Sequence, residues 1–295
     1  MQIPKIIVPP LKIQGKKTLL LPFIRSHLPD FEVWVEPFMG SGAVGFNVRP
    51  KKAIFADINP HIISFYSAVK SGEITAFSAK TFLTEQGKLL AEGGEGYYKK
   101  VRERFNESCN PLDFLFLNRS CFNGMMRFNR HGKFNVPFGH KPQRFSKAYV
   151  TKIVNQIKHT ERLIRENEWT FVCQDFSDTL KSPPSGAFVY CDPPYIGRHT
   201  DYYDGWNEEK ESRFSATLLN GTVAFMVSSW YENKYRKNEF LEKYWSRARL
   251  YTTEHFYHLG AKEKHRNAVT EALLLNYAPK TAEIPQEPAG QLYLF

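Results

Sequence analysis

The chain has 295 residues, of which 42% are hydrophobic and 24% are charged, a composition that fits one large globular domain or two ordinary ones and excludes a mostly disordered protein. Lysine and arginine (40) outnumber aspartate and glutamate (30), and the net charge of +10 favours a polyanionic partner, either nucleic acid or an anionic membrane surface. No apolar run approaches the roughly 18 residues of a membrane-spanning helix, and the first residues carry no signal-peptide pattern, so we expect a cytoplasmic protein.

Short apolar runs rich in β-branched and aromatic residues alternate with helical patterns, which predicts an α/β sheet fold. In chain order, the predicted strands are 33–35, 53–56, 170–172, 188–190 and 223–227, followed by a late strand pair at 250–258 and 272–276. The predicted helices are 43–48, 60–71, 79–90, 97–107 and 147–167.

The pattern changes between residues 72 and 167, where long charged helices flank a loop-rich basic segment, 118–145. This change predicts an inserted, mainly helical domain that divides a sheet domain formed by residues 1–71 and 168–280. Residues 281–295 form a polar, proline-containing tail that we expect to be flexible and that ends in an apolar pentapeptide.

The four cysteines, Cys109, Cys121, Cys173 and Cys191, are widely spaced and include no CxxC pair. Such spacing gives no indication of a zinc site. In a chain without a secretion signal, it predicts four reduced thiols in the core.

The first motif, VWVEPFMGSG, leads an apolar strand into a glycine turn at Gly40 and Gly42. Glycines let a ligand approach the backbone, and the following helix N-terminus offers free N–H groups. The next strand ends at Asp57, where Rossmann-like sheets carry a carboxylate that accepts hydrogen bonds from ribose hydroxyls. The glycine spacing is shorter than GxGxxG, which argues against a dinucleotide. The motif therefore predicts a nucleotide-like ligand, with a purely structural turn as the alternative.

The second motif, FVYCDPPY, spans residues 188–195. An apolar strand delivers Asp192 at its C-terminal end, where ligands bind in open α/β sheets. Pro193 and Pro194 fix the backbone and leave carbonyl acceptors beside the ring of Tyr195. Acceptors beside a flat apolar face suit a planar substrate with an exocyclic amine. A proline turn with a structural aspartate is the alternative.

FxGxG, the second-strand Asp57 and DPPY together resemble the amino-methyltransferases that use S-adenosylmethionine (AdoMet). The basic motif LKIQGKK at residues 11–17 and a segment at 117–139 with LNRSCFNG and FNVPFG extend the similarity to the Dam-like, D12 class adenine-N6 DNA methyltransferases. The resemblance covers about residues 8–277 and is greatest to modification methyltransferases of the EcoRV type, in VPPLKIQGKKT, LNRSCFNG and CDPPYIGRH. It implies a Rossmann-like AdoMet-dependent methyltransferase sheet with an inserted helical DNA-recognition domain.

The resemblance also implies residue roles. Asp192 and the Pro193 carbonyl would bind the N6 amine of an adenine flipped out of duplex DNA, with Tyr195 stacked on the base. Lys17 would lie near the methionyl carboxylate of AdoMet, and Asp175 near its adenine amine. The implied catalytic residues are Asp192, Pro193, Pro194 and Tyr195. The implied cofactor-binding residues are Ile13, Lys17, Pro37, Phe38, Gly40, Ser41, Gly42, Asp57, Asp175 and Asp192. The product would be S-adenosylhomocysteine, and no metal is required.

Sequence readout is expected in the basic segment. Arg127 can contact guanine O6 and N7, and Asn123 can contact adenine or a phosphate. Phe122 or Phe128 would occupy the space that the flipped base leaves. The predicted DNA-binding residues are Lys12, Arg119, Phe122, Asn123, Gly124, Arg127, Arg130, Lys133, Asn135, Pro137, Lys141 and Arg144. For any single basic residue, a solvated surface position is the alternative.

The last five residues, QLYLF, resemble the peptide by which bacterial replication and repair proteins dock onto the sliding clamp. In that mode an extended peptide buries apolar side chains in a groove of its partner. The implied clamp-binding residues are Gln291, Leu292, Leu294 and Phe295. A tail that packs on its own domain is the alternative.

The motifs and the resemblance lead to one functional prediction: a site-specific enzyme that methylates adenine N6 in double-stranded DNA. The expected target is GATATC or another GAT-containing site, in restriction-modification or related DNA marking. Two alternatives stay open, an RNA adenine-N6 methyltransferase and a non-catalytic DNA-binding regulator derived from such an enzyme. We expect a monomer associated with the nucleoid of a bacterial or phage-infected cell, without a membrane partner.

Overall fold

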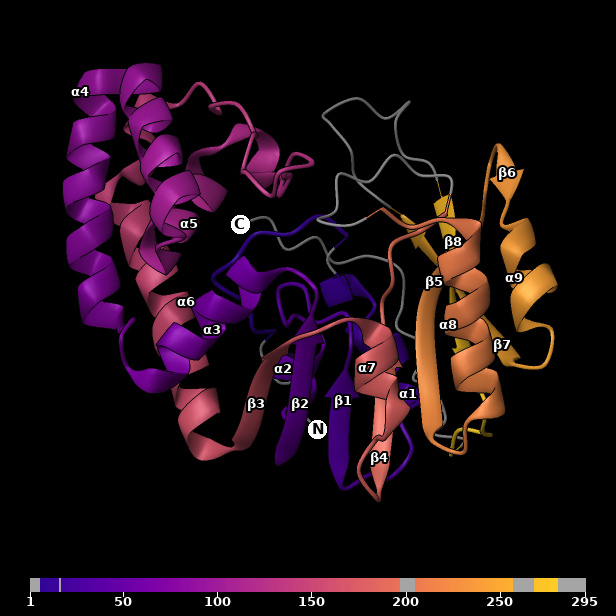
Figure 1. Ribbon diagram of the computed structural model, residues 1–295. Helices are drawn as coiled ribbons and strands as arrows, with labels where there is room; N and C mark the ends of the chain where they lie inside the picture. Colours follow the sequence, from indigo (N-terminus) through magenta and orange to yellow (C-terminus); the bar gives the residue numbers. More distant parts are fainter. Residues whose placement is uncertain (1–5, 16, 197–204, 257–267, 281–295) are drawn as a thin grey trace.

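The computed structural model describes residues 6–15, 17–196, 205–256 and 268–280. Its central sheet has the strand order β3-β2-β1-β4-β5-β8-β7, with β6 paired to β5 as a short hairpin (Figure 1). The first five strands of the sheet, β3 to β5, pair in parallel, whereas β8 and β7 pair antiparallel. The predicted α/β, Rossmann-like class is therefore confirmed. The strands are β1 (Val33–Glu36), β2 (Lys52–Asp57), β3 (Glu168–Cys173), β4 (Ala187–Cys191), β5 (Ala224–Asn233), β6 (Arg236–Lys237), β7 (Arg249–Phe256) and β8 (Ala268–Leu275).

Helices cover both faces of the sheet. The helical elements are η1 (Lys17–Leu19), α1 (Leu21–Ser26), α2 (Gly45–Val48), α3 (Pro60–Ser71), α4 (Ala76–Ser108), α5 (Pro111–Ser120), η2 (Phe122–Gly124), η3 (Pro142–Phe145), α6 (Lys147–Glu166), α7 (Phe176–Lys181), α8 (Glu208–Asn220) and α9 (Glu239–Trp245). Successive strand residues point to opposite faces, so Trp34 packs under α1 to α6 while Val35 packs under α7 to α9. In Figure 1, α4, α5 and α6 stand together on one side of the sheet, and α8 and α9 stand on the other.

Local signals explain the boundaries of the longer helices. The side chain of Asn59 accepts the first free N–H of α3, and Gly72 ends that helix in the left-handed conformation. Thr75 and Ser78 form a capping box at the start of α4. The predicted helices 79–90 and 97–107 are one element in the structure, bent at Gly94, whose φ is +51°.

Most predicted strands agree with the structure to within two residues. β8 begins at Ala268, four residues before the predicted start at 272, and β5 differs at its end. We expected it to end at 227, because the apolar run stops there; it continues to Asn233. The two serines after Val227 break the hydrophobic pattern, yet their backbones pair with β8 and keep the strand extended. Tertiary pairing therefore adds half of this strand and the hairpin that follows it.

The structure also corrects the prediction for the thiols. All four are free, but only Cys121 and Cys191 are buried, while Cys109 and Cys173 are exposed. Cys109 is exposed because it caps the C-terminus of α4, and Cys173 because it ends the outermost strand β3. The predicted tail and its clamp peptide, Gln291 to Phe295, lie outside the described residues, as does Lys16. Within the described ranges, every helix is too short or too polar to cross a bilayer.

Candidate active site

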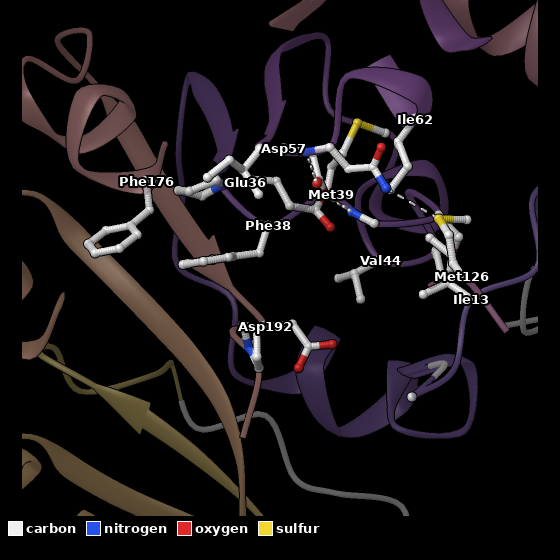
Figure 2. A pocket seen from close by; sticks show the side chains of 18 of the residues that line it. Ile13, Glu36, Phe38, Met39, Val44, Asp57, Ile62, Met126, Phe176 and Asp192 are labelled. Carbon is white, nitrogen blue, oxygen red and sulfur yellow. Dashed lines mark hydrogen bonds between the residues drawn. The ribbon is translucent and has the colours of Figure 1, made fainter. Parts of the chain in front are cut away.

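A pocket opens at the carboxyl ends of β1, β2 and β4 (Figure 2). From β1 the chain runs outward through β2 and β3, then returns to β4 on the other side of β1. Helices therefore diverge to opposite faces between β1 and β4, and such a switch point leaves a crevice where ligands bind in open α/β sheets. Figure 2 shows Glu36, Phe38, Asp57 and Asp192 around this space.

Asp57 ends β2, and the backbone around it orients its carboxylate. Oδ2 accepts the Gly40 N–H at 2.9 Å, and Oδ1 accepts the Asn59 N–H at 2.9 Å. The turn that brings Gly40 there requires a φ of +49°, which glycine adopts without strain. Burial raises the pKa of Asp57 to about 6, against the effect of these two hydrogen bonds. The group is therefore mostly ionised at neutral pH, with lone pairs left to accept hydroxyl protons.

Glu36 is a second carboxyl in the pocket, and the sequence analysis missed it. Its Oε2 accepts the indole N–H of Trp34 at 2.8 Å, and only 2% of the residue is exposed. A Cβ at Gly45 would lie 2.5 Å from Oε2 and 2.3 Å from Phe55, so only glycine fits beside this carboxyl. Burial raises its pKa to about 8. A buried carboxyl of this kind suits a cationic ligand, which would hold it in the ionised form.

Asp192 follows β4 directly and pairs with Lys17. The Lys17 Nζ lies 2.9 Å from Asp192 Oδ1 and donates to the Tyr195 hydroxyl at 2.8 Å. Burial alone would lower the pKa of Lys17, but Asp192, together with Tyr195, Glu271 and Tyr190, raises it well above its ordinary value. Burial raises the pKa of Asp192, and Lys17 opposes that rise. The ammonium therefore keeps a mostly buried carboxylate ionised and in place.

The closest polar partners of Lys17 belong to the DPPY motif, and the residue also lines the pocket. The resemblance implied a cation next to the methionyl carboxylate of the cofactor. In the structure, η1 directs this side chain to the end of β4, where it contacts the DPPY motif. Its partners are Asp192 and Tyr195, so the ammonium acts on the carboxylate and hydroxyl of that motif.

Aromatic rings form one wall of the pocket. Phe38 stacks on Phe176 with ring centroids 5.6 Å apart, and Trp206 meets Phe38 edge-on at 5.5 Å. Glu211 orients Trp206 by accepting its indole N–H at 2.7 Å, and its other oxygen accepts the indole N–H of Trp245, also at 2.7 Å. An apolar aromatic wall of this kind suits a planar heterocycle.

Asp175 lies at the rim of this wall. It caps α7 by accepting the Ser177 N–H at 2.9 Å, and Arg213 lies 3.6 Å from it. The side chain also lines the pocket. Asp175 therefore has a structural partner, and it also faces the space where a ligand would bind.

The pocket brings together most of the predicted cofactor residues. Those that line it are Ile13, Lys17, Pro37, Phe38, Gly40, Ser41, Asp57, Asp175 and Asp192. Pro194, which was predicted as a catalytic residue, lines it as well. Gly42 does not line it but leaves room for the Phe46 ring, 2.7 Å from where its Cβ would be. Pro193 and Tyr195 line a smaller adjoining cavity. Lining residues that the sequence analysis did not single out include Glu36, Asn59, Met125, Met126, Phe176 and Trp206.

The N-terminal motif and the predicted recognition segment are joined directly. The Asn118 side chain accepts the Lys12 N–H and donates to the Lys12 carbonyl, both at 2.7 Å. Gly124, with φ +65°, makes room for the Lys12 side chain, because a Cβ there would lie 2.8 Å from Lys12 Cδ. Next to this contact, Met125 and Met126 line the pocket. The same segment therefore forms part of the pocket and part of the surface predicted to read DNA.

The predicted DNA-binding residues divide by exposure. Exposed residues are Phe122, Asn123, Arg130, Lys133, Pro137 and Lys141. Arg127 is half-buried, and its Nε donates to Asn135 Oδ1 at 2.9 Å. Arg144 is half-buried and donates to the Tyr149 hydroxyl at 2.8 Å. Phe128 is half-buried and packs against His61 and Phe134.

Arg119 does not fit the phosphate contact that we expected. Only 4% of it is exposed, and its guanidinium donates to Gln156 Oε1 and, at 3.5 Å, to the Tyr149 hydroxyl. These partners belong to α6, so the side chain ties α5 to α6 in the interior. The basic segment predicted an exposed Arg119 side chain. The side chain instead points into the protein, because the face of α5 that carries it is buried.

The chain is similar in sequence to known adenine methyltransferases. A model of the D12 class N6 adenine-specific DNA methyltransferase family matches residues 14–259. A DNA adenine methylase of Serratia marcescens is 37% identical over 195 residues, 63% of this chain and just under two thirds (66%) of that protein. A DNA adenine methylase of Escherichia coli (strain K12) is 31% identical over 280 residues, 91% of this chain and 95% of that protein. A solved rRNA methyltransferase, AviRa from Streptomyces viridochromogenes, aligns over 91% of this chain and 88% of its own at 13% identity and a TM-score of 0.34.

The family match extends from the basic motif at the N-terminus past both strand-end carboxylates and the predicted recognition segment. It therefore includes all of the residues that line the pocket except Ile13, among them Lys17, Asp57 and Asp192. This chain belongs to the D12 class N6 adenine-specific DNA methyltransferase family and is a DNA methyltransferase that acts on adenine N6.

Proposed function

We propose that this enzyme transfers the methyl group of S-adenosylmethionine to N6 of an adenine turned out of duplex DNA, and releases S-adenosylhomocysteine. One observation carries the proposal: the Asp192 carboxylate, ion-paired with Lys17, opens into the same pocket as Asp57 and Glu36. A carboxylate at a strand end can accept N–H protons from an exocyclic amine. The carboxyls of Asp57 and Glu36 and the aromatic wall beside Asp192 suit the ribose, the ammonium group and the adenine of AdoMet.

The chemical groups in the pocket fit AdoMet part by part. Asp57 has free lone pairs for the two ribose hydroxyls. Glu36, whose pKa is raised to about 8 by burial, gains from a cation and suits the α-ammonium group. Phe38, Phe176 and Trp206 offer an aromatic wall for the adenine ring, and Asp175 can accept a hydrogen bond from its amine.

The reaction needs an activated amine. The N6 lone pair of adenine is delocalised into the ring, so N6 is a poor nucleophile. Asp192 and the Pro193 carbonyl would each accept a hydrogen bond from the N6 amine. These hydrogen bonds favour a pyramidal nitrogen with a localised lone pair. Bound AdoMet would supply a methyl group on a sulfonium, from which the neutral thioether leaves readily. The residues of the site would hold N6 in line with that methyl group, so that a C–N bond forms as the C–S bond breaks, S-adenosylhomocysteine is released and N6 gives up one proton to water.

Charge and position provide the rate gain. The ionised Asp192 complements the positive charge that develops on N6 in the transition state. Lys17 keeps that carboxylate ionised and oriented, and Tyr195, which accepts from Lys17, offers its ring for stacking. Holding the amine in line with the methyl group removes much of the entropic barrier.

The proposed activity needs one part of the chain to hold the cofactor and another to recognise DNA. We propose that residues 72–167 form the DNA-recognition domain and that residues 1–71 and 168–280 form the catalytic domain. Exposed residues of the basic segment, with Arg127 and Asn135, would read a GATATC or other GAT-containing site and contact phosphates. The enzyme would act as a monomer in restriction-modification or related DNA marking.

Methyl incorporation tests the proposed function. With methyl-labelled AdoMet, we expect label in duplex DNA that carries GAT-containing sites, recovered as N6-methyladenine. Single-stranded RNA of the same sequence, offered in parallel, should take up little label. Transfer to RNA alone would favour the RNA methyltransferase alternative, and AdoMet binding without transfer to any nucleic acid would favour a regulator.

The C-terminal peptide gives a separate proposal. The motif QLYLF matches a mode in which Leu294 and Phe295 occupy an apolar groove of the bacterial sliding clamp, and tethering would raise the local concentration on newly replicated DNA. We expect deletion of residues 291–295 to abolish capture of the purified enzyme by immobilised clamp. Methylation of a short linear duplex without clamp should be unchanged. Capture that is undiminished by the deletion would contradict the proposal.

A further inference from the structure

Trp206 lines the cofactor pocket from a position just outside a helix. It directly precedes Asn207, whose side chain caps α8 by accepting the Lys210 N–H at 2.9 Å. The Trp206 ring lies 5.5 Å from the rings of both Phe38 and Phe176. Contacts between rings tolerate a range of orientations, whereas a hydrogen bond is directional. A hydrogen bond to the indole would therefore decide how this ring faces a ligand.

The carboxylate of Glu211 makes that hydrogen bond. Its Oε2 accepts the Trp206 indole N–H at 2.7 Å, and its Oε1 accepts the Trp245 indole N–H, also at 2.7 Å. Glu211 is the fourth residue of α8, and Trp206 is the residue before the cap; side chains at these two positions often meet at the start of a helix. Trp245 is only 2% exposed, so the carboxylate is fixed on its far side by the core.

The two indoles explain why this residue is a glutamate. Each indole N–H needs an acceptor, and the two oxygens of a carboxylate can both accept. A glutamine would offer one oxygen and would turn its NH2 group toward the other indole. Burial raises the pKa of Glu211, and the hydrogen bonds from Trp245 and Trp206 lower it. These bonds therefore favour the ionised form, which is the form that can accept from both rings.

The same helix packs the aromatic wall against the core. The ring of Phe214 lies 5.4 Å from that of Phe38 and 5.4 Å from that of Trp245, so it connects a pocket ring with a core ring. Trp206 is thus held by a hydrogen bond and by packing, both from α8. A ring that is already in its binding position loses little side-chain entropy when a ligand arrives.

We propose that Glu211 is a positioning residue for the cofactor, which holds the Trp206 ring against the adenine of AdoMet and so sets the affinity for AdoMet. Glu211 lines the smaller adjoining cavity and not the cofactor pocket, so it acts on the cofactor through Trp206. The inference rests on the proposed function, since it takes AdoMet as the ligand of the pocket.

The test variant is Glu211→Gln, which keeps the shape of the side chain but can accept from only one indole. The matched control is Glu209→Gln, because Glu209 is an exposed glutamate in the first turn of the same helix and does not line the pocket. Dissociation constants are measured by calorimetry for S-adenosylhomocysteine and for 5′-methylthioadenosine, which keeps the adenine and ribose but lacks the amino-acid part. Thermal unfolding reports whether each variant is folded.

We expect Glu211→Gln to bind both ligands about five- to tenfold more weakly than the control, since one pocket side chain must then be ordered on binding. In methylation of duplex DNA, its KM for AdoMet should rise by a similar factor while kcat at saturating AdoMet stays near that of the control. This pattern is expected when a mutation removes binding that is equal in the ground state and the transition state.

Trp206→Phe breaks the same hydrogen bond from the pocket side. It should also weaken the binding of both ligands, so it tests the inference even if Glu211→Gln does not fold. In the Trp206→Phe background, adding Glu211→Gln should change affinity by less than about twofold, because no indole remains there to be held. An equal loss in both backgrounds would mean that Glu211 acts through the general fold, and would overturn the inference.

Unchanged affinity of folded Glu211→Gln for both ligands would also overturn it, as would a loss for S-adenosylhomocysteine alone, which would place the effect at the amino-acid end. A fall in kcat with unchanged KM would assign Glu211 to the DPPY motif, whose residues share the smaller cavity, and would count against the inference in the same way. Failure of the wild-type enzyme to bind either ligand would instead count against the proposed function, so the two failures are distinguishable.

Discussion

Asp192→Asn is expected to lower kcat for methyl transfer by at least 10² to 10³-fold, about the loss seen when one charge-stabilising group is removed from an active site. Asparagine keeps the shape of the side chain, but it cannot complement the positive charge that develops on N6. The measurement is single-turnover transfer of labelled methyl groups to a duplex with the target site. Single-turnover conditions report the chemical step without product release.

The same exchange leaves the Lys17 ammonium, of which 4% is exposed, without its ion-pair partner. Some loss of stability is therefore expected, and thermal unfolding and AdoMet affinity must be measured beside activity. Asp178→Asn is a matched control, because Asp178 is an exposed aspartate in the nearby helix α7 and does not line the pocket. A rate within a few-fold of wild type in a folded Asp192→Asn enzyme would remove the proposed catalytic role.

Lys17→Met is expected to reduce kcat and to shift the acidic limb of the pH–rate profile to higher pH. Activity requires an ionised Asp192, so it falls as pH drops through the pKa of that carboxyl. Lys17 lowers this pKa, and its removal therefore raises it, so that activity is lost at a higher pH than in the wild type. Methionine has a similar length and is apolar, which limits the packing change in this buried position.

Lys17→Arg separates charge from geometry. Arginine keeps a cation beside Asp192, so its acidic limb should stay near that of the wild type even if the larger group lowers kcat. The shift for Lys17→Met must exceed that for Lys17→Arg if electrostatics is the cause. Superimposable acidic limbs for wild type and Lys17→Met would mean that the ammonium does not control the ionisation of Asp192.

The positions of Asp57 and Asp192 at strand ends could be predicted, because a short apolar run followed by an aspartate is enough to indicate them. Asp57 and Asp192 each follow an apolar run, and Gly40 lies in the turn after another. Parallel strands bring their carboxyl ends to one edge, so a local pattern is enough to bring such groups together. Glu36 obeys the same rule, since it follows the apolar residues of β1, and applying the rule to that strand would have found it.

The aromatic wall could not be predicted in this way. Phe38, Phe176 and Trp206 come from three separate segments, and no spacing rule connects them. They meet because α7 and α8 pack on one face of the sheet. The burial of Arg119 could not be predicted either. A basic residue in a basic segment is expected at the surface, but the contact of α5 with α6 buries this side chain.

By itself, the sequence determined the α/β class, the glycine turn, the two predicted strand-end carboxylates and the enzyme family, because each depends on residues close together in the chain. Only the tertiary structure decided which charges meet. Lys17 and Tyr195 are 178 positions apart, yet their hydrogen bond is 2.8 Å long. Such contacts depend on how buried faces pack and on which groups remain to neutralise a charge removed from water. Neither the packing of buried faces nor the partner of a buried charge can be predicted from a pattern of neighbouring residues.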